Sequence, residues 1–504
     1  MIYLWLEAFS MFLSFDYLIV LVGGTIIGIT LGALPGLGPA FTLALFLPVT
    51  FGMDPAVALV FLGALYSASV FGGAITAILI NAPGTPGSVA TTFDGYPLAQ
   101  QGKGGLALGA AATASLIGGI VGFIALAGLS PLIASIALQF NAATYFMLAI
   151  FGLSMVAFAS QGNTLKGLML AGLGLIISFI GRDPVSGGLR FTFDNVYLED
   201  GISFVPAAIG LFALSQAFIL LGKGGTISKI EGTISKVRDG MVETFKRPVN
   251  LIRSSTLGVV LGAIPGVGIS IANFVAYLFE QRSSKKPKSY GKGNVGGVIA
   301  PESANNATSV AELIPAITLG LPGGATSAIF LAAITLHGLQ PGAAFFSSDS
   351  AISYIVFVGM LLSQFAFFVL AMIGMKYFVK VTLVPNEILG VAIITLALVG
   401  SYAYQYKVTD MFIAIAFGVL GYIMVKYHYP LAPLILGLVL GSMVESNYRR
   451  ALLMSDGSHS IFFTPFPLTI LIITILILVF PFLIKTIKNI NKKENDYDNN
   501  QTLS

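Results

Sequence analysis

The chain has 504 residues, of which 56% are hydrophobic and 10% are charged, and its formal net charge is +4. Soluble domains carry about 25% charged residues, so this composition excludes an ordinary soluble protein and gives no sign of nucleic-acid binding. Cysteine is absent and only three histidines occur, which excludes disulfides and argues against a histidine-rich metal centre. Apolar runs of about 20 residues recur along most of the length, so we expect an all-α polytopic membrane protein in a lipid bilayer.

The N-terminal region is predicted to enter the membrane and turn back. Residues 1–16 are expected to form an interfacial segment anchored by Trp5. In the next segment, residues 17–52, Gly28–Gly38 reads GITLGALPGLG, and its proline and glycines would interrupt a helix in mid-membrane. Free backbone groups are tolerated there only where they line a cavity. The flanks of this hairpin contain acids and no base, so we expect it to enter from outside.

Five membrane crossings are expected next and would complete a first membrane repeat over residues 17–222. They place Lys103 and Lys166 on the cytoplasmic side and the acidic loop 182–204 outside, in keeping with the positive-inside rule. A basic cytoplasmic loop is expected over residues 223–250. The five crossings are expected near residues 55–80, 105–128, 141–160, 164–181 and 204–222.

The motif of the first hairpin returns 230 residues later, where Gly258–Gly268 reads GVVLGAIPGVG and is identical at seven of eleven positions. Lys and Arg contribute seven residues to Lys223–Arg253 and five to Gln281–Gly293, so both flanks of residues 254–280 should be cytoplasmic. The arms of about 12 to 16 residues rise only 1.5 Å per residue and cannot cross a ~30 Å core. We therefore predict a second re-entrant hairpin that enters from the opposite side.

The predicted fold class is two inverted repeats, each a re-entrant hairpin plus about five transmembrane helices, with one extra C-terminal helix. The second repeat covers residues 251–446, a segment over 447–488 contains the last helix, and a disordered cytoplasmic tail is expected over residues 489–504. The N-terminus would lie outside and the C-terminus in the cytoplasm, with Arg449 and Arg450 outside against the positive-inside rule. The later crossings are expected near residues 295–320, 351–375, 387–402, 409–425, 430–446 and 466–484.

A second glycine–proline break accompanies each hairpin motif, since residues 81–88 read NAPGTPGS and residues 319–327 read LGLPGGATS. A broken helix presents free N–H groups that attract anions at one new end and free carbonyls that attract cations at the other. Four such breaks in mid-membrane would hold a carboxylate without a basic side chain; the alternative is that these glycines only allow close helix packing. The candidate substrate-binding residues are Pro35, Gly36, Gly38, Asn81, Gly84, Thr85, Gly266, Gly268, Pro322, Gly323, Thr326 and Ser327.

The most polar membrane segment is residues 300–309, APESANNATS. At 100° per residue, Glu302, Asn305, Asn306 and Ser309 share one helix face. Polar side chains inside a membrane indicate function, and their oxygens suit a coupling Na⁺, while Glu302 is a candidate proton carrier. The alternatives are an interhelical hydrogen-bond clamp and a segment at the cytoplasmic water boundary. The candidate coupling-ion residues are Glu302, Asn305, Asn306 and Asn273; beyond Na⁺ or H⁺ we expect no metal and no cofactor.

No enzyme is expected, because GxSxG, HExxH and P-loop motifs are absent from the sequence. A coupled ion gradient is therefore the expected energy source. One rival interpretation is a passive anion channel, whose flux would not saturate. Another is a non-transporting scaffold or a lipid-modifying enzyme, but paired backbone breaks have no purpose in a scaffold and no nucleophile–base pair supports the enzyme.

These motifs resemble the large membrane subunit of the tripartite tricarboxylate transporters, the TctA family. The resemblance covers nearly the whole chain in order, and PESANNA at residues 301–307 is its most specific stretch. One departure is Gln216, where the resemblance leads us to expect an acidic residue after Ala213-Leu-Ser215. The other matching stretches are GALPGLGPA (32–40), NAPGTPGS (81–88), residues 181–216, GAIPGVG (262–268), residues 313–323 and HGLQPG (337–342).

The resemblance implies secondary uptake of tricarboxylates or related organic acid anions across a bacterial inner (cytoplasmic) membrane, driven by a Na⁺ or H⁺ gradient. It also implies two partners, a small four-helix membrane subunit and an extracytoplasmic solute-binding protein that delivers the anion. Neither the transported carboxylate nor the coupling ion follows from the motifs themselves.

Overall fold

The fold of the described residues is helical apart from one short β-ribbon, in which β1 pairs antiparallel with β2 through Gly181 and Arg190. Eight helices of this part of the chain are long and apolar enough to span a membrane. The predicted class, an all-α polytopic membrane protein, is therefore confirmed. The computed structural model describes residues 2–158, 164–183, 186–223, 225, 236–346, 350–378, 380 and 383–477.

The first half of the chain has its initial helix break where the sequence predicts it, between α2 and α3. Helix α2 ends at Gly32, and α3 starts at Pro39, where proline at the first turn removes no intrahelical bond. The elements of this half are α1 (Ile2–Met11), α2 (Phe15–Gly32), α3 (Pro39–Phe46), η1 (Leu47–Thr50), α4 (Pro55–Ile80), η2 (Pro86–Ser88), α5 (Val89–Leu98), η3 (Ala99–Lys103), α6 (Gly104–Ala137), α7 (Ala142–Phe158), α8 (Thr164–Ser178), β1 (Gly181–Arg182), β2 (Leu189–Arg190), η4 (Val196–Leu198), α9 (Phe204–Ala208), η5 (Ile209–Leu214) and α10 (Ser215–Lys223).

The second half repeats the pattern, with a break between α12 and α13 at the second PG motif. Its elements are α11 (Val237–Phe245), α12 (Pro248–Gly262), α13 (Gly268–Ser283), η6 (Pro287–Ser289), α14 (Gly296–Ala311), α15 (Leu313–Leu319), α16 (Ala325–Leu336), η7 (Ala343–Phe346), α17 (Ser350–Phe378), α18 (Asn386–Gln405), α19 (Val408–Lys426), α20 (Leu431–Met454) and η9 (His459–Phe463), followed by an apolar helix over Pro465–Ile477.

The helices add detail to the predicted segments. The crossing expected near 295–320 coincides with α14 and α15, which meet at Glu312, and the chain breaks at Gly320, which has a left-handed φ of 69°. Helix α5, with the sequence VATTFDGYPL, lies between two expected crossings. Helix α11 lies inside the segment expected as a basic loop. The predicted tail, residues 489–504, lies outside the described residues.

Matching glycines pack each hairpin against the long helix that follows it. A Cβ atom on Gly28 would lie 2.7 Å from the carbonyl oxygen of Leu65, and one on Gly258 would lie 2.6 Å from that of Ala304. One turn later, Gly32 and Gly262 meet Ser69 and Thr308 through the same kind of backbone contact. Hence α2 packs on α4 as α12 packs on α14. This equivalence supports the predicted repeat, while its inverted orientation stays a prediction.

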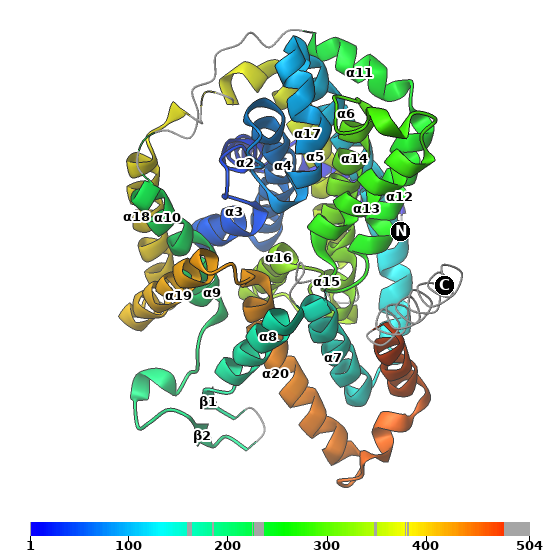
Figure 1. Ribbon diagram of the computed structural model, residues 1–504. Coiled ribbons are helices and arrows are strands. Elements are labelled where there is room, and N and C mark those ends of the chain that lie inside the picture. The colour runs from blue at the N-terminus through cyan, green and yellow to red at the C-terminus, as the bar shows by residue number, and fades with distance from the viewer. Residues whose placement is uncertain are drawn as a thin grey trace, which may run out of the picture.

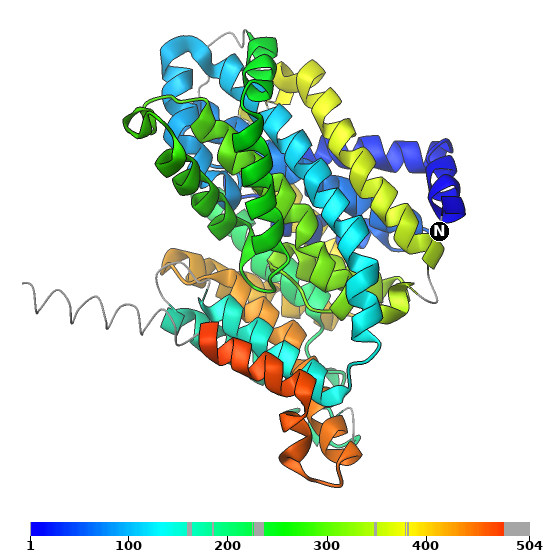
Figure 2. The same cartoon turned by 90° about the vertical axis from the view of Figure 1, so that its right-hand side faces the viewer.

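Helices from the two halves cross over at the periphery of the molecule. Helix α20 of the second half packs against α7 and α8 of the first, and these lie together in the lower part of Figure 1. In the same way, α18 and α19 pack against η5 and α10 at the left of that view. Figure 2 shows α6 beside the second-half helices of the upper bundle, above the layer that contains α7 and α20. Neither half therefore forms a separate body.

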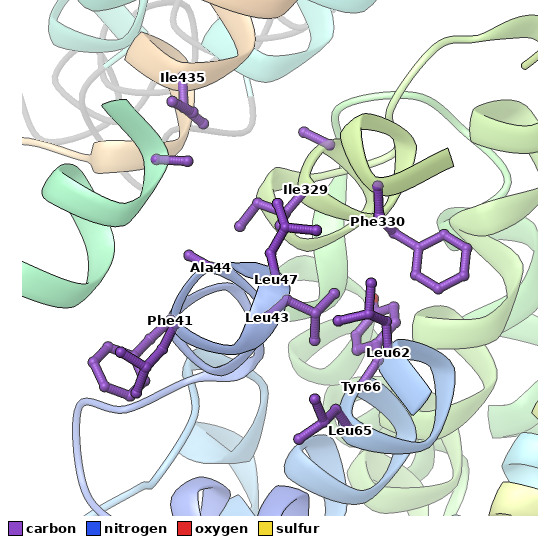
Figure 3. Close-up of a cluster of buried hydrophobic side chains, with 14 of the residues drawn as sticks. Phe41, Leu43, Ala44, Leu47, Leu62, Leu65, Tyr66, Ile329, Phe330 and Ile435 are labelled. Atoms are coloured by element: carbon purple, nitrogen blue, oxygen red, sulfur yellow. The ribbon is translucent and has the colours of Figure 1, made fainter. Parts of the chain in front are cut away.

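An apolar cluster joins the halves at the centre of the molecule. Leu43 of α3 points towards Leu62 of α4, while Phe41 lies on the other side of α3 (Figure 3). Phe330 of α16 and Ile435 of α20 belong to the same cluster. Each of these side chains is at most 6% exposed. Burial of a side chain of this size stabilises a fold in water by about 1.5–3 kcal/mol, and in a membrane the same contacts act through close packing instead. The cluster fixes α3 and α16, which both start at helix breaks.

Loops that are expected on the outer side contact one another. Thr50 Oγ1 lies 3.0 Å from His337 Nε2, and Lys407 Nζ lies 2.6 Å from Asp200 Oδ2. Arg449 lies 2.7 Å from Asp183 and 3.1 Å from Glu445. These carboxylates compensate the charge of the arginine, which explains how one of the two bases that break the positive-inside rule is accommodated there.

Loops that are expected on the cytoplasmic side also contact one another. The Gln101 amide donates to the carbonyl oxygen of Lys292 at 2.9 Å, and the Gly225 N–H donates to Glu387 at 2.9 Å. Lys166 Nζ lies 4.1 Å from the centre of the Tyr429 ring. Each of these contacts joins segments that the predicted topology places on one side. They are consistent with the grouping of loops and do not show which side faces the cytoplasm.

Candidate functional site

The four helix breaks meet around one cavity with a volume of about 790 Å³. The hairpin tips contribute residues 36–41 and 266–271, and the second breaks contribute residues 83–87 and 324–326. The π-helix η5 and the start of α10 form a further wall, and residues 428–433 form another. A π-helix is rare and often marks a functional site. No Lys or Arg lines the cavity within the described part of the chain.

The starts of several helices border this cavity. Helix α3 starts at Pro39, α13 at Gly268, α16 at Ala325 and α20 at Leu431. The first turn of a helix has N–H groups without intrahelical acceptors, and the helix dipole adds partial positive charge there. Four such ends on one cavity make an anion-attracting environment from backbone alone.

The hairpin tips require glycine. Gly36 and Gly266 have φ angles of 86° and 84°, in the left-handed region that side chains disfavour. The N–H of Gly266 donates to the carbonyl oxygen of Gly323 at 2.9 Å, which joins the two breaks of the second half. At the other tip, Gln216 packs so closely that its Nε2 would lie 2.2 Å from a Cβ on Gly36. The tips are therefore held by specific contacts.

The second break of the first half presents two hydroxyl groups. Thr85 Oγ1 and Ser88 Oγ lie 2.9 Å apart, and Thr85 lines the cavity. A Cβ on Gly73 would lie 2.6 Å from Thr85 Oγ1 and 2.7 Å from Ser88 Oγ, so only glycine leaves room for this pair. The N–H of Gly84 donates to the Gly73 carbonyl at 3.2 Å and fixes the turn.

The second break of the second half holds a carboxylate instead. Glu312 lies at the junction of α14 and α15, is 1% exposed overall and lines the cavity. Tyr66 donates a hydrogen bond to Glu312 Oε1, and the backbone of Ser327 in the first turn of α16 also bonds this carboxyl. The Ser327 hydroxyl accepts from the Gly324 N–H at 2.8 Å and completes the start of α16. Glu312 is thus the one acidic side chain in the described lining.

The polar helix α14 packs against the cavity wall with Glu302 behind it. Thr91 and Ser115 both donate to the Glu302 carboxylate, the latter at 3.1 Å, so this acid connects α5 and α6 to α14. The Asn306 amide lies 3.4 Å from the carbonyl oxygen of Ser67. Glu302 and Asn306 do not line the cavity.

Three buried amide oxygens lack hydrogen-bond partners among the described residues: the Oδ1 atoms of Asn273, Asn305 and Asn306. Asn305 lines the cavity, and its Oδ1 would lie 2.4 Å from a Cβ on Gly87. The Asn273 amide donates to the carbonyl oxygen of Gly87 at 2.6 Å. Unpaired buried oxygens are costly, and amide oxygens are suitable ligands for a hard cation. The chemistry of these donors therefore fits a Na⁺ ion beside the cavity.

The structure brings most of the predicted substrate-binding residues to the cavity and leaves others behind its walls. Asn81 is exposed and stands apart: it ends α4 in a left-handed conformation with a φ of 54°, a position that asparagine tolerates well. The predicted residues in the lining are Gly36, Gly38, Gly84, Thr85, Gly266, Gly268, Thr326 and Asn305, whereas Pro35, Asn81, Pro322, Gly323, Ser327, Glu302, Asn306 and Asn273 are outside it.

Several lining residues were not predicted from the sequence. Glu312 carried a usable signal, because a lone acid in the apolar stretch 310–319 marks a site in a membrane protein. Residues 428–433 carried none, since their place at the cavity depends on how α20 packs. Phe212 of η5 reads as an ordinary membrane residue, and its π-helical turn has no sequence signature.

The fold and the cavity define a multi-pass helical membrane protein with a cavity between interrupted helices, an arrangement that occurs in membrane transporters. The model of the tripartite tricarboxylate transporter TctA family matches residues 18–436. The chain therefore belongs to the TctA family, as the motifs indicated. This family provides the large subunit of tripartite tricarboxylate transporters.

Two relatives come from Agrobacterium vitis. The "Uncharacterized 52.8 kDa protein in TAR-I ttuC' 3'region" is 36% identical over 444 residues, which are 88% of each chain. The "Uncharacterized protein in TAR-II ttuC' 3'region" is 34% identical over 207 residues, which are 41% of this chain and 86% of that protein. No solved structure matches the chain.

Proposed function

We propose that this chain is the large membrane subunit of a secondary, ion-gradient-driven, binding-protein-dependent transporter that takes up tricarboxylates or related organic acid anions. The observation that carries the proposal is the meeting of four helix starts on a cavity whose described lining has no Lys or Arg. Backbone N–H groups bind carboxylates without a strong fixed charge, which allows the anion to leave again. The volume of about 790 Å³ lies in the range of small-molecule sites.

The substrate would bind between the hairpin tips. In this arrangement the anion accepts hydrogen bonds from the backbone N–H groups of Gly36, Gly38 and Gly268, with the hydroxyls of Thr85 and Thr326 beside it. The Gly266 N–H, already bonded to the Gly323 carbonyl, keeps the second tip in shape. Six residues that the sequence predicted to bind the substrate would instead shape these breaks: Pro35, Asn81, Gly84, Pro322, Gly323 and Ser327.

The coupling cation would bind at the unpaired amide oxygens. Asn273 and Asn305 both lie next to Gly87, and Asn306 adds a third oxygen on α14. A Na⁺ ion there would neutralise part of the anion's charge and so link the two binding events. Glu302, bonded to Thr91 and Ser115, is the alternative carrier if the coupling ion is H⁺.

TctA proteins belong to tripartite systems with a small membrane subunit and a binding protein. We propose that this chain works with a four-helix membrane subunit and an extracytoplasmic solute-binding protein in the bacterial inner membrane, with its N-terminus outside. The absence of cysteine makes the topology directly testable. In the inverted arrangement, Asp54→Cys reacts with an impermeant thiol reagent from one face and Lys285→Cys from the other. Reaction of both from the same face would refute the inverted repeat.

Uptake by the reconstituted system tests the function. The chain, its small subunit and its binding protein are placed in vesicles, and labelled citrate uptake is measured with and without a Na⁺ or H⁺ gradient. We expect saturable uptake that needs the gradient, and a loss of at least about tenfold in Asn305→Ala combined with Gly266→Ala, because about 1.4 kcal/mol corresponds to tenfold. Gly172→Ala is the matched control, since an added Cβ there meets nothing within 4 Å.

A passive channel makes the opposite prediction. It would conduct ions across a planar bilayer without the binding protein, and its flux would rise with concentration without saturation. Steady anion currents of that kind, together with unchanged uptake in the double variant, would refute the carrier and the site assignment.

A further inference from the structure

The two second breaks differ at one aligned position. Pro322 follows Pro83 by 239 residues, and the same offset pairs Gly84 with Gly323 and Ser88 with Ser327. It also pairs Gly73 with Glu312. At equivalent places beside the cavity, one half therefore has no side chain and the other has a carboxylate.

The structure holds the Glu312 carboxylate firmly at the cavity wall. Tyr66 and the backbone of Ser327 both present donors to it. Glycines make room for it, because a Cβ on Gly324 would lie 3.0 Å from Glu312 Oε2 and one on Gly323 would lie 2.6 Å from Glu312 Cβ. Two donors at one carboxyl favour its ionised, accepting form and so oppose the burial, which favours the neutral form.

Glu312 thereby occupies the start of α16, one of the helix ends that would otherwise bind an anion. At the equivalent break of the first half, Thr85 and Ser88 place two hydroxyl groups in the space beside Gly73, and no acidic side chain stands at that position. The cavity thus has an anion-accepting pole at Gly36–Gly38 and Thr85, and a pole that already contains a negative charge.

We propose that Glu312 is a charge-selecting residue, a built-in carboxylate that lowers the affinity of the cavity for each further negative charge on the bound anion. Of the groups proposed to bind the anion, the Gly36–Gly38 and Thr85 pole takes its carboxylates. The side with Gly268 and Thr326, next to Glu312, takes its less charged end. This inference rests on the proposed anion-transport function. Like charges a few ångströms apart in a partly buried site repel by enough to change affinity tenfold or more.

Two carboxylate anions of similar size, glutarate and tricarballylate, distinguish this role from a structural one. Tricarballylate is glutarate with one additional carboxylate on its central carbon, so the ratio of their Kd values reports the response to one charge. The Kd values are measured by calorimetric titration of the purified full chain in lipid nanodiscs. Glu312→Gln keeps an oxygen acceptor for Tyr66 while it removes the charge.

We expect Glu312→Gln to lower the ratio of the tricarballylate Kd to the glutarate Kd by about tenfold or more. Glu243→Gln is the matched control, because its exposed i,i+3 pair with Lys246 on α11 lies away from the cavity, and its ratio should equal that of the unmodified chain. A residue that only clamps α16 would change the melting temperature and leave the ratio unchanged. An unchanged ratio in Glu312→Gln overturns the proposal.

A second pair of variants covers the case in which Glu312→Gln does not fold. Glu312→Asp and Glu312→Asn have the same size and differ in charge, so the proposal requires a higher ratio for Asp than for Asn, and equal ratios overturn it. If the unmodified chain binds neither anion while it folds normally, the proposed anion site itself is wrong. Binding of both anions with no effect of charge at position 312 leaves the anion site intact and refutes the selection.

Discussion

The two second breaks share a backbone design and differ in chemistry. In both, a glycine at an equivalent position, Gly84 or Gly323, packs against the helix that precedes the break. In the first half the hydroxyl groups of Thr85 and Ser88 occupy the space beside Gly73, whereas in the second half the matching position has the Glu312 side chain. The two breaks therefore have a similar backbone shape and differ in the polar groups that they present.

The largest expected effects come from the shared backbone contacts. A Cβ on Gly84 would lie 2.1 Å from the carbonyl oxygen of Gly32, and one on Gly323 would lie 2.9 Å from that of Glu312. Neither backbone atom can move freely, so we expect Gly84→Ala to destabilise the protein by about 3 kcal/mol or more and Gly323→Ala by about 2 kcal/mol. The measurement is thermal unfolding of the purified chain in detergent, with Gly172→Ala as the control. Normal unfolding of Gly84→Ala would show that the break is not packed as described.

Removal of a hydroxyl group from either break should have a smaller effect, and the effect should differ between the two breaks. Thr85→Val removes a group that lines the cavity, so we expect the KM for the anion to rise about fivefold, as for the loss of one hydrogen bond of about 1 kcal/mol. Ser327→Ala removes a group that bonds the start of α16 and is outside the lining. We expect it to cost about 1 kcal/mol of stability, as for a lost helix cap, with an unchanged KM.

Uptake kinetics and thermal unfolding of both variants check this pair of expectations. A changed KM in Ser327→Ala, together with a change of stability alone in Thr85→Val, would contradict these expectations. The roles of the two breaks would then be exchanged.

The smallest effect is expected at the outer loops, where charge is solvated. Lys407 bonds Asp200, and both side chains are largely exposed, at 45% and 73%. This contact lowers the pKa of Asp200 below its usual value, so its contribution to stability is present at neutral pH and is lost as the pH falls through the lowered pKa. Because exposed pairs contribute little, Asp200→Asn should unfold like the unmodified chain at pH 7. A clear loss of stability would show that this loop contact holds α9 and α19 together.

The helix breaks could be predicted because their signal is local. Proline and left-handed glycine at Pro35–Gly38 and Pro265–Gly266 interrupt a helix whatever surrounds them. Helix α5 could not be predicted in the same way, because its polar sequence has no helical pattern of apolar residues and Asp94 is buried against the segment that precedes α14. The Asp94 carboxylate accepts backbone N–H groups from residues 291–294, at 2.7 to 3.2 Å, and no local pattern reports such a contact.

One part of the candidate site could be predicted from the sequence and another part could not. Glycines and Thr85 reach the cavity because the breaks themselves form its walls. Glu302 shared a predicted face with Asn305, yet only Asn305 reaches the cavity, because α5 and α6 cover the acid. Periodicity identifies a helix face and cannot tell which neighbour that face meets.

The most direct test of the central claim is whether an anion occupies the space between the two second breaks. Because the chain has no cysteine, Thr85→Cys and Thr326→Cys each provide a single reactive group in the cavity lining, one from each second break. The account predicts that a transported carboxylate slows thiol modification at both positions with the same concentration dependence, while Gly172→Cys on α8 reacts at an unchanged rate. Equal modification rates with and without the carboxylate at both cavity positions, in variants that still transport it, would contradict the account.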